Sequence, residues 1–291
     1  MIRLKELGKV YKDFELKVSM EIRPGSVCGL IGKNGAGKST TIKAILGLIR
    51  PGSGSIEVLG KDPKDFTAKD REAIGACLAD SGFSRLLRLE DVVHILKKLY
   101  RDFDEAQFRR LCKEQGLPED KKLGDYSTGM KAKLRVLTAL CHKAKLLILD
   151  EPTAGLDVMA RTDILDMLRA YMAEDDERSM LISSHISSDL EGLCDEIYMI
   201  SDGHILLHED TDVLLGQYGI IKLSGEDYEK MDKTYLVSAK KQPYGYDCLT
   251  NEKQFYMENY PAAAIENSDI DSIILLMLGG EKVAAREEGK R

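Results

Sequence analysis

The chain has 291 residues, a net charge of −7 and 43% hydrophobic residues. A chain of this length can bury one sizeable core and has room for a second small domain. The acidic balance argues against a nucleic-acid partner, because such proteins usually carry a basic patch, and no apolar run approaches the roughly 18 residues of a membrane span. The longest run, Ile273–Leu278, predicts a packed C-terminal helix rather than a membrane anchor.

Cysteine and histidine spacing gives no sign of a metal site or of disulfides. The six cysteines form no C-x-x-C pair, and most lie among apolar neighbours. We therefore expect buried thiols in a reducing cytosol. Four histidines, His94, His142, His204 and His208, share no ligand spacing, which favours surface or packing roles.

The first 60 residues predict short strands joined by sharp turns, as at Pro24-Gly25 and Pro51–Gly54. Met1–Glu6 is typical of an opening strand and lacks the apolar core of a signal peptide. An apolar strand, Val27–Ile31, is followed by a glycine-rich segment and then by a predicted helix over Thr41–Ile49.

The glycine-rich segment fits the phosphate-loop pattern G-x-x-x-x-G-K-[ST]. Its glycines let the backbone turn tightly and direct N–H groups at phosphate oxygens, and the following helix directs its positive dipole end there too. Lys38 is expected to reach the β- and γ-phosphates and Ser39 to ligate Mg²⁺. The candidate nucleotide-binding residues are Gly32, Asn34, Gly35, Ala36, Gly37, Lys38, Ser39 and Thr40.

Residues from about 80 to 143 have a helical pattern. Apolar residues recur at helical spacing from Leu89 to Leu99, and Phe103–Gln115 is a second amphipathic stretch. The segment Tyr126–Met130 lies at the start of a third helix. We interpret this region as a helical insert.

Strands return with Leu146–Asp150, where four apolar residues end in two consecutive acids, Asp150 and Glu151. A buried parallel strand of this kind delivers its carboxylates to the C-terminal edge of a sheet, where one can support a metal and the other can activate water. Further strands are predicted over 179–183 and 197–200, and Asp202-Gly203 predicts a hairpin to 204–208. Helices are predicted over 159–172 and 187–194 between these strands. Alternating strands and helices indicate a mainly parallel α/β sheet.

The composition changes after about residue 215, because the last part of the chain is richer in tyrosine and has no histidine. Strands are predicted over 219–223, 234–239, 247–250 and 262–265, with helices over 225–232, 251–259 and 269–278. This order resembles a split β-α-β arrangement. We therefore expect a cassette over residues 1–212 and a C-terminal accessory domain of mixed α and β structure over residues 213–291.

The ordered motifs of residues 1–212 resemble the ATP-binding-cassette (ABC) family, specifically its stand-alone nucleotide-binding subunits. Besides the phosphate loop and the acid pair, the resemblance rests on Tyr126–Met130, on Ala154–Asp157 and on His185 after an apolar strand. The run Ser127–Lys131 looks like bacterial exporters of the type-2 group. The resemblance implies a RecA-like P-loop NTPase fold with an N-terminal antiparallel part and a helical insert.

The resemblance also implies roles for individual residues. Asp150 matches the acid that supports Mg²⁺ through water, Glu151 the general base, and His185 the switch histidine that contacts the γ-phosphate. Asp157 matches the acid at the contact between two cassettes. Tyr11 matches the aromatic that stacks on adenine, and Phe14 is the second candidate for this role. The alternative is that Tyr11 is an ordinary aromatic residue of an edge strand without a role in binding.

Two segments depart from the family pattern. In the signature segment Ser127 and Gly129 are kept, so a phosphate-ready helix start remains, while Thr128 and Met130 replace the commonest residues. Lys131, Lys133 and Arg135 follow, either to face an anion or as a solvated basic face. In the second segment, Ala79 or Asp80 stands where many members have a glutamine, and Asp80 is a candidate ligand to Mg²⁺ or its waters.

The leading hypothesis is a transport ATPase subunit that binds ATP and Mg²⁺, works as a homodimer or as a heterodimer with another cassette, and drives a separate integral membrane permease. Such a subunit would be cytoplasmic, peripheral on the inner face of the membrane. A soluble cassette ATPase acting on ribosomes or chromosomes is the alternative, and the single cassette without long coiled coils argues against it. A cassette that binds ATP without turnover is disfavoured by intact Lys38, Asp150, Glu151 and His185.

The segment Asp80–Asp91 is the candidate permease contact. Phe83, Leu86 and Leu87 are more apolar than a solvent loop needs, and Arg85 and Arg88 lie beside them. Apolar anchors with arginine are typical of interface hot spots. The alternative is that these residues only pack the insert against the core.

Overall fold

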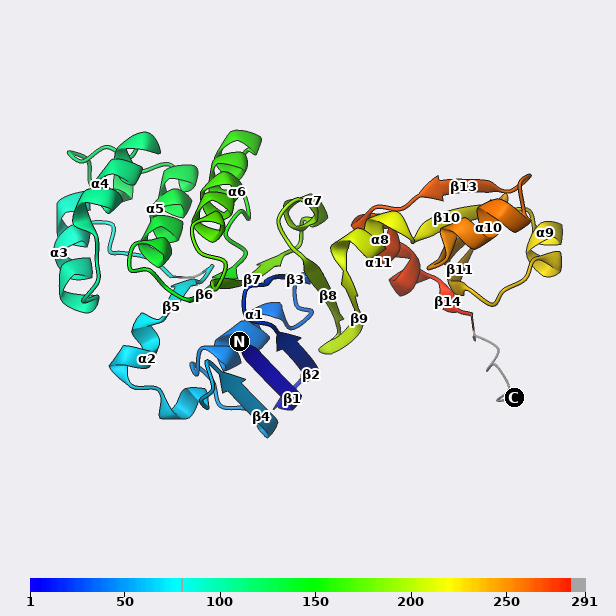
Figure 1. Cartoon of the computed structure of the whole chain (residues 1–291), viewed down its shortest axis with the longest axis horizontal. Coiled ribbons are helices and arrows are strands. Elements are labelled where there is room, and N and C mark those ends of the chain that lie inside the picture. The colour runs from blue at the N-terminus through cyan, green and yellow to red at the C-terminus, as the bar shows by residue number, and fades with distance from the viewer. Residues whose placement is uncertain (80, 284–291) are drawn as a thin grey trace. The chain divides into compact units, whose positions relative to one another are not determined.

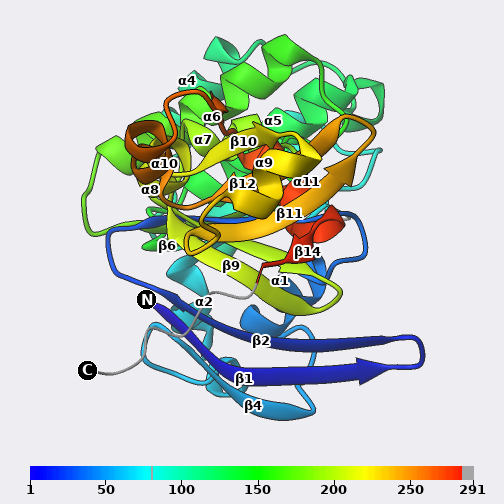
Figure 2. The same cartoon turned by 90° about the vertical axis from the view of Figure 1, so that its right-hand side faces the viewer.

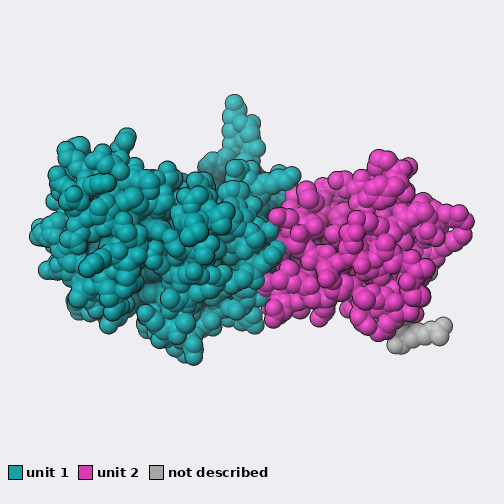
Figure 3. Space-filling model, turned by 90° about the horizontal axis from the view of Figure 1, so that it is seen from above, with its two compact units in different colours: residues 1–208 teal, residues 209–291 magenta. Residues whose placement is uncertain are grey.

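The computed structural model describes residues 1–79 and 81–283. The chain divides into two compact units, Met1–His208 (unit 1) and Glu209–Arg291 (unit 2), which Figure 3 shows in different colours. Each unit has a sheet and a core of its own.

Unit 1 is built on a nine-stranded sheet with the order β4-β1-β2-β9-β8-β3-β7-β6-β5 (Figure 1). The strands are β1 (Ile2–Tyr11), β2 (Phe14–Ile22), β3 (Val27–Ile31), β4 (Ser53–Val58), β5 (Ile74–Cys77), β6 (Leu146–Asp150), β7 (Ser179–Ser184), β8 (Glu196–Ser201) and β9 (His204–Asp210). The helices are α1 (Lys38–Ile45), α2 (Ala68–Glu72), α3 (Leu89–Leu99), α4 (Glu105–Glu114), α5 (Thr128–Leu140), α6 (Val158–Ala173) and α7 (Ser187–Glu191), with 3₁₀ turns η1 (Pro63–Asp65) and η2 (Leu123–Asp125).

The central strands of this sheet are parallel. β3 pairs with β7 and β8, and β6 pairs with β5 and β7. Every residue of β3, β6 and β7 is buried, as expected of strands covered on both faces. Their carboxyl ends therefore meet at one edge, and the segments that follow Ile31, Asp150 and Ser184 all start there.

The N-terminal part is antiparallel, because β1 pairs with β2 on one side and with β4 on the other (Figure 2). β2 alternates strictly, with Leu16, Val18, Met20 and Ile22 buried between exposed residues. α1 packs against β2 and β4 and also against β6, so the first helix joins the antiparallel and parallel parts in one core.

Three helices form the predicted insert. α3 buries Leu89, Val92, Val93 and Leu96, which is the stripe expected from the spacing. Leu99, at the last position of the same pattern, is exposed instead. Predicted helix bounds differ from the observed ones by a few residues, and the helix predicted over 187–194 already ends at Glu191, before Gly192.

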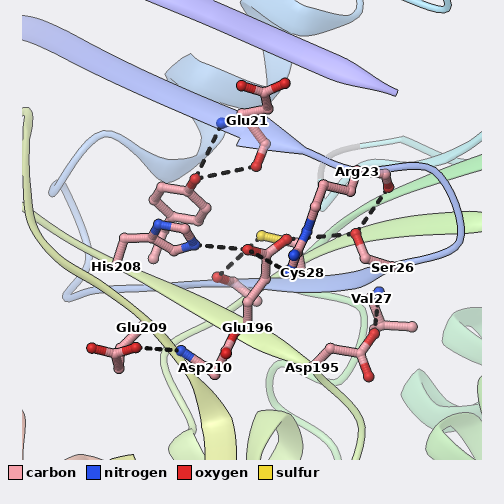
Figure 4. Close-up of polar contacts among 12 residues, drawn as sticks. Glu21, Arg23, Ser26, Val27, Cys28, Asp195, Glu196, His208, Glu209 and Asp210 are labelled. Atoms are coloured by element: carbon pink, nitrogen blue, oxygen red, sulfur yellow. Dashed lines mark hydrogen bonds and ion pairs between the residues drawn. The ribbon is translucent and has the colours of Figure 1, made fainter. Parts of the chain in front are cut away.

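The hairpin β8–β9 closes unit 1, with Asp202 and Gly203 both at positive φ in the turn. A polar cluster around the buried Glu196 of β8 links the two strands of this hairpin (Figure 4). Glu196 Oε2 lies 2.7 Å from His208 Nε2, and the Ser26 hydroxyl donates to Glu196 Oε1 at 3.5 Å. The His208 ring stacks on Tyr198 at 3.8 Å between centroids. The last residue of unit 1 is thus fixed to the strand pair β3–β8.

Unit 2 contains a five-stranded antiparallel sheet with the order β13-β10-β12-β11-β14. Its elements are α8 (Thr211–Gly216), β10 (Gly219–Leu223), α9 (Gly225–Lys230), β11 (Leu236–Gln242), β12 (Gly245–Thr250), α10 (Lys253–Asn259), β13 (Ala264–Asn267), α11 (Ile270–Gly279) and β14 (Glu281–Lys282). β12 lies between β10 and β11, the two strands joined through α9. No helix among the described residues is long and apolar enough to cross a membrane.

Candidate nucleotide-binding site

The glycine-rich loop between β3 and α1 depends on its glycines for backbone geometry. Gly35 and Gly37 have φ of 84° and 116°, and Gly37 caps α1 in the left-handed conformation. A Cβ at Gly32 would lie 2.3 Å from the Ile200 carbonyl, and one at Gly37 would lie 2.8 Å from Leu16. Side chains at these positions would therefore strain the turn or push the loop away from the sheet.

Lys38, the first residue of α1, has a side chain that is only 5% exposed. Its ammonium donates to the carbonyls of Gly32 at 2.6 Å and Lys33 at 3.2 Å. It also forms an ion pair with Glu151, with Nζ 3.0 Å from Oε1. The positive charge thus lies within the curl of the loop.

The acid pair at the end of β6 is held by Ser183 of β7. Asp150 is buried and accepts a hydrogen bond from the Ser183 hydroxyl at 2.7 Å. The same hydroxyl accepts from the backbone N–H of Glu151 at 3.0 Å. Sequence analysis did not identify Ser183, whose only signal is a polar residue near the end of an apolar strand.

Glu151 has a positive φ of 51° and a side chain that is 12% exposed. Its second carboxylate oxygen, Oε2, lies 2.5 Å from His185 Nδ1. One carboxylate therefore contacts the cation of the glycine-rich loop and the histidine that follows β7. Three residues from three separate motifs of the sequence meet at this point.

A cavity of about 410 Å³ opens over this group. It is lined by Phe14, Asn34, Gly35, Gly37, Lys38, Ser39, Thr40, Ala79, Glu151, Ala154 and His185. Phe14 lines the cavity, and Tyr11 does not, although the two rings lie 6.3 Å apart. Gly32 and Ala36 belong to the loop but do not line the cavity. The Ala36 carbonyl accepts a hydrogen bond from Gly203 N–H at 2.9 Å, which ties the loop to the β8–β9 hairpin.

The other predicted residues lie outside this cavity. The Ser127 hydroxyl caps α5 by accepting from Met130 N–H at 3.2 Å. Gly129 allows close packing of α5 on α6, since a Cβ there would lie 3.0 Å from that of Ala160. Asp157 caps α6 by accepting from Ala160 N–H at 2.9 Å. The structure does not bring Ser127, Gly129 and Asp157 together with the phosphate loop of the same chain.

The basic residues after the signature segment have partners within the chain. Lys131 donates to the Gly124 carbonyl at 3.1 Å, Lys133 pairs with Asp163 at 2.5 Å, and Arg135 donates to the Ala79 carbonyl at 2.8 Å. These contacts favour packing over a free anion site. Asp80, the candidate metal ligand, lies outside the described residues.

Comparison with known proteins places this geometry in context. The family model described as ABC transporter matches residues 16–154. The ABC transporter ATP-binding protein YtrB of Bacillus subtilis is 32% identical over 226 residues, which is 77% of each chain. The bacitracin transport ATP-binding protein BcrA of Bacillus licheniformis is 34% identical over 210 residues, covering 71% of this chain and 68% of that one. A solved structure of an ATP-binding subunit of an ABC transporter aligns with a TM-score of 0.65 and 28% identity over 73% of this chain and 91% of that one.

Proposed function

The chain belongs to the ATP-binding, ATP-hydrolysing subunits of ABC transporters, and we propose that it drives export through a separate membrane permease. The observation that carries the catalytic part is the position of Glu151 between Lys38 and His185, at the wall of the cavity. Transport is supported by the similarity to BcrA, which is a bacitracin transport protein by its name, and the outward direction is proposed from the resemblance of Ser127–Lys131 to type-2 exporters.

Each part of the cavity has a proposed task. The loop Gly32–Thr40 binds the phosphates, and Lys38 exchanges its contact with Glu151 for one with the β- and γ-phosphates. Glu151, released from that ion pair, accepts a proton from the attacking water, and His185 holds the γ-phosphate. An aromatic side chain of the β1–β2 hairpin stacks on adenine in this proposal: Tyr11 by the family resemblance, or Phe14, which lies 6.3 Å from Tyr11 between ring centroids and lines the cavity.

Mg²⁺ suits the oxygen donors of this site. Ser39 lines the cavity, and the buried Asp150 directly precedes Glu151, which also lines it; hard cations prefer such oxygen ligands. Ser39 and Asp150 would hold the ion, which when bound neutralises phosphate charge. The hydrogen bond from Ser183 keeps the Asp150 carboxylate in place whether or not the ion is bound.

A second cassette completes the site in this proposal. Ser127 and Gly129 form a phosphate-ready helix start that is remote from the cavity of their own chain. A partner cassette, either an identical chain or a homologue, would present this segment to the γ-phosphate, with Asp157 at the contact. Closure and reopening of the pair would then be coupled to the permease.

Replacement of Glu151 by Gln tests both catalysis and dimer closure. We expect turnover to fall by roughly 10²–10⁴-fold, the usual contribution of a positioned base, while ATP still binds. With ATP and Mg²⁺ this variant should run as a closed dimer in light scattering, and Ser127→Arg in the same chain should abolish that dimer. The control is Glu177→Gln, an exposed acid just before β7, at the opposite end of that strand from His185. Parent-like turnover of Glu151→Gln would refute the assignment.

A further inference from the structure

We infer that Asp189 is a positioning residue. It holds the loop that carries Glu151, the start of α6 and the switch histidine His185 at fixed positions relative to one another. The inference rests on the proposed function of Glu151 and His185. Asp189 lies on α7, four residues after His185, and belongs to none of the motifs that identify the family.

The Asp189 carboxylate is 0% exposed, yet it contacts two other segments of unit 1. Thr153 Oγ1 donates to Asp189 Oδ2 at 2.6 Å, and Arg161 Nε donates to Asp189 Oδ1. The Arg161 guanidinium also donates from Nη2 to the Ser188 hydroxyl at 2.5 Å. Both carboxylate oxygens are thus occupied by groups from outside α7.

Each contact begins close to a residue of the proposed site. Thr153 follows Glu151 by two residues and is itself buried, in the turn that closes with Ala154 N–H on the Glu151 carbonyl. Arg161 lies on α6 one turn after Asp157, and its N–H donates to the Asp157 carbonyl at 3.0 Å. Asp189 therefore ties together the segments that carry Glu151, Asp157 and His185.

The chemistry of the contact explains why an acid is needed. A buried carboxylate is stable only when charged or strong donors satisfy it, and here a guanidinium and a hydroxyl do so. A bond between charged partners fixes direction as well as distance, and Glu151 is held in a left-handed backbone conformation that neighbouring segments must maintain. Catalytic groups lose about 10²-fold in rate when displaced by about 1 Å.

Two substitutions separate positioning from simple stabilisation. Asp189→Asn removes the charge, and Thr153→Val removes only the hydroxyl contact while the pair with Arg161 remains. We expect each to lower kcat by about 10–100-fold, with KM for ATP and the affinity for a fluorescent ATP analogue unchanged within about 2-fold. Asp166→Asn is the matched control, because it removes an exposed pair with Arg169 on the same helix α6 and should leave kcat unchanged.

Epistasis with the switch histidine gives the deciding readout. If Asp189 acts by aligning Glu151 with His185, Thr153→Val and Asp189→Asn should cause little further loss of kcat in a His185→Ala background, because that background already lacks the contact between Glu151 and His185. Equal losses in both backgrounds, or losses confined to ATP affinity or thermal stability, would overturn the inference. If Asp189→Asn fails to fold, Thr153→Val decides alone. If Glu151→Gln lowers turnover and Thr153→Val does not, only this inference is refuted. If Glu151→Gln keeps parent-like turnover, the proposed function is refuted.

Discussion

At the scale of single residues, the site combines two opposite charges in one buried contact. Lys38 and Glu151 are both largely removed from solvent, and their ion pair lacks the alignment of a hydrogen bond at Glu151 Oε1. Buried charges are costly unless they are well paired. An incoming triphosphate would give Lys38 a stronger partner and free the carboxylate, so binding and activation of the base would occur together.

Glu196 is also a buried charge that needs a partner, although it has no role in the site. Its contact with His208 leads to a prediction about stability. His208→Phe keeps a ring on Tyr198 but removes the 2.7 Å contact, so within residues 1–79 and 81–283 the Glu196 carboxylate keeps only Ser26 at 3.5 Å and Arg23 at 3.8 Å. We expect the free energy of unfolding of unit 1 to fall by about 1–3 kcal/mol. Urea unfolding, followed through the alkylation of the buried Cys28, measures it.

His204→Phe is the control for this prediction. His204 is exposed, and its Nδ1 contacts the Asp202 carbonyl at 2.9 Å, so its loss should change the free energy of unfolding by less than about 0.5 kcal/mol. Equal effects of the two substitutions would show that the contact with Glu196 contributes nothing to stability.

At the scale of elements, sequence periodicity and turn chemistry predicted most of what the structure contains. The strand predicted over 219–223 is β10 with the same bounds, and Asp202-Gly203 forms the predicted hairpin. Errors occur at the ends of helices and strands alike, since the strand predicted over 262–265 is β13 (Ala264–Asn267). α1 begins at Lys38 rather than Thr41, because Gly37 adopts a left-handed cap that the sequence pattern does not reveal.

The sequence predicts those residues of the candidate site that belong to short motifs. It does not predict residues whose contacts form only when distant segments pack together. A phosphate loop or an acid pair is a short pattern with its own physical reason. Ser183, Thr153 and Asp189 gain their partners only when β7, α6 and α7 come together, since each contact joins residues 28 or more positions apart. Phe14 likewise lines the cavity because its ring lies beside the phosphate loop, where a Cβ at Gly37 would be 3.2 Å from Phe14 Cζ.

The segment before α3 carries the prediction that belongs to this scale. Leu86 is 76% exposed, whereas Phe83 is half-buried and lines a cavity of about 330 Å³ with Arg85 and Arg135. We propose that the permease contacts this segment. Leu86→Ser should leave ATP hydrolysis by the isolated chain within about 2-fold of the parent, because an exposed side chain contributes little to folding, and it should reduce the fraction that sediments with membranes of the native host.

The matched control for this surface is Leu99→Ser. Leu99 is 59% exposed on the last turn of α3, the helix that follows this segment, so a general effect of lost surface hydrophobicity would appear in both variants. If Leu86→Ser and Leu99→Ser sediment alike, the contact with the permease must lie elsewhere on the chain.

At the scale of the whole molecule, the six cysteines distinguish the two units. All six are free and buried, as the sequence predicted, and Cys248 belongs to unit 2 while the other five belong to unit 1. Burial raises the pKa of Cys77 to about 11 and that of Cys248 to about 12. At pH 8 the thiols of the folded chain are therefore both covered and protonated, and an alkylating reagent should react only after a unit opens.

Unfolding of the two units should thus be separable by alkylation in increasing urea. Unit 2 has the smaller core, and small domains bury a smaller fraction of their surface, so Cys248 should react at lower urea than the cysteines of unit 1. If ATP with Mg²⁺ binds the phosphate-loop cavity of unit 1, as we propose, it should stabilise that unit by about 2.7 kcal/mol at a hundredfold excess over Kd. Mass spectrometry of the alkylated peptides should show the unit 1 cysteines shifting to higher urea with ATP while Cys248 stays. A common shift of all six would mean that the units unfold as one.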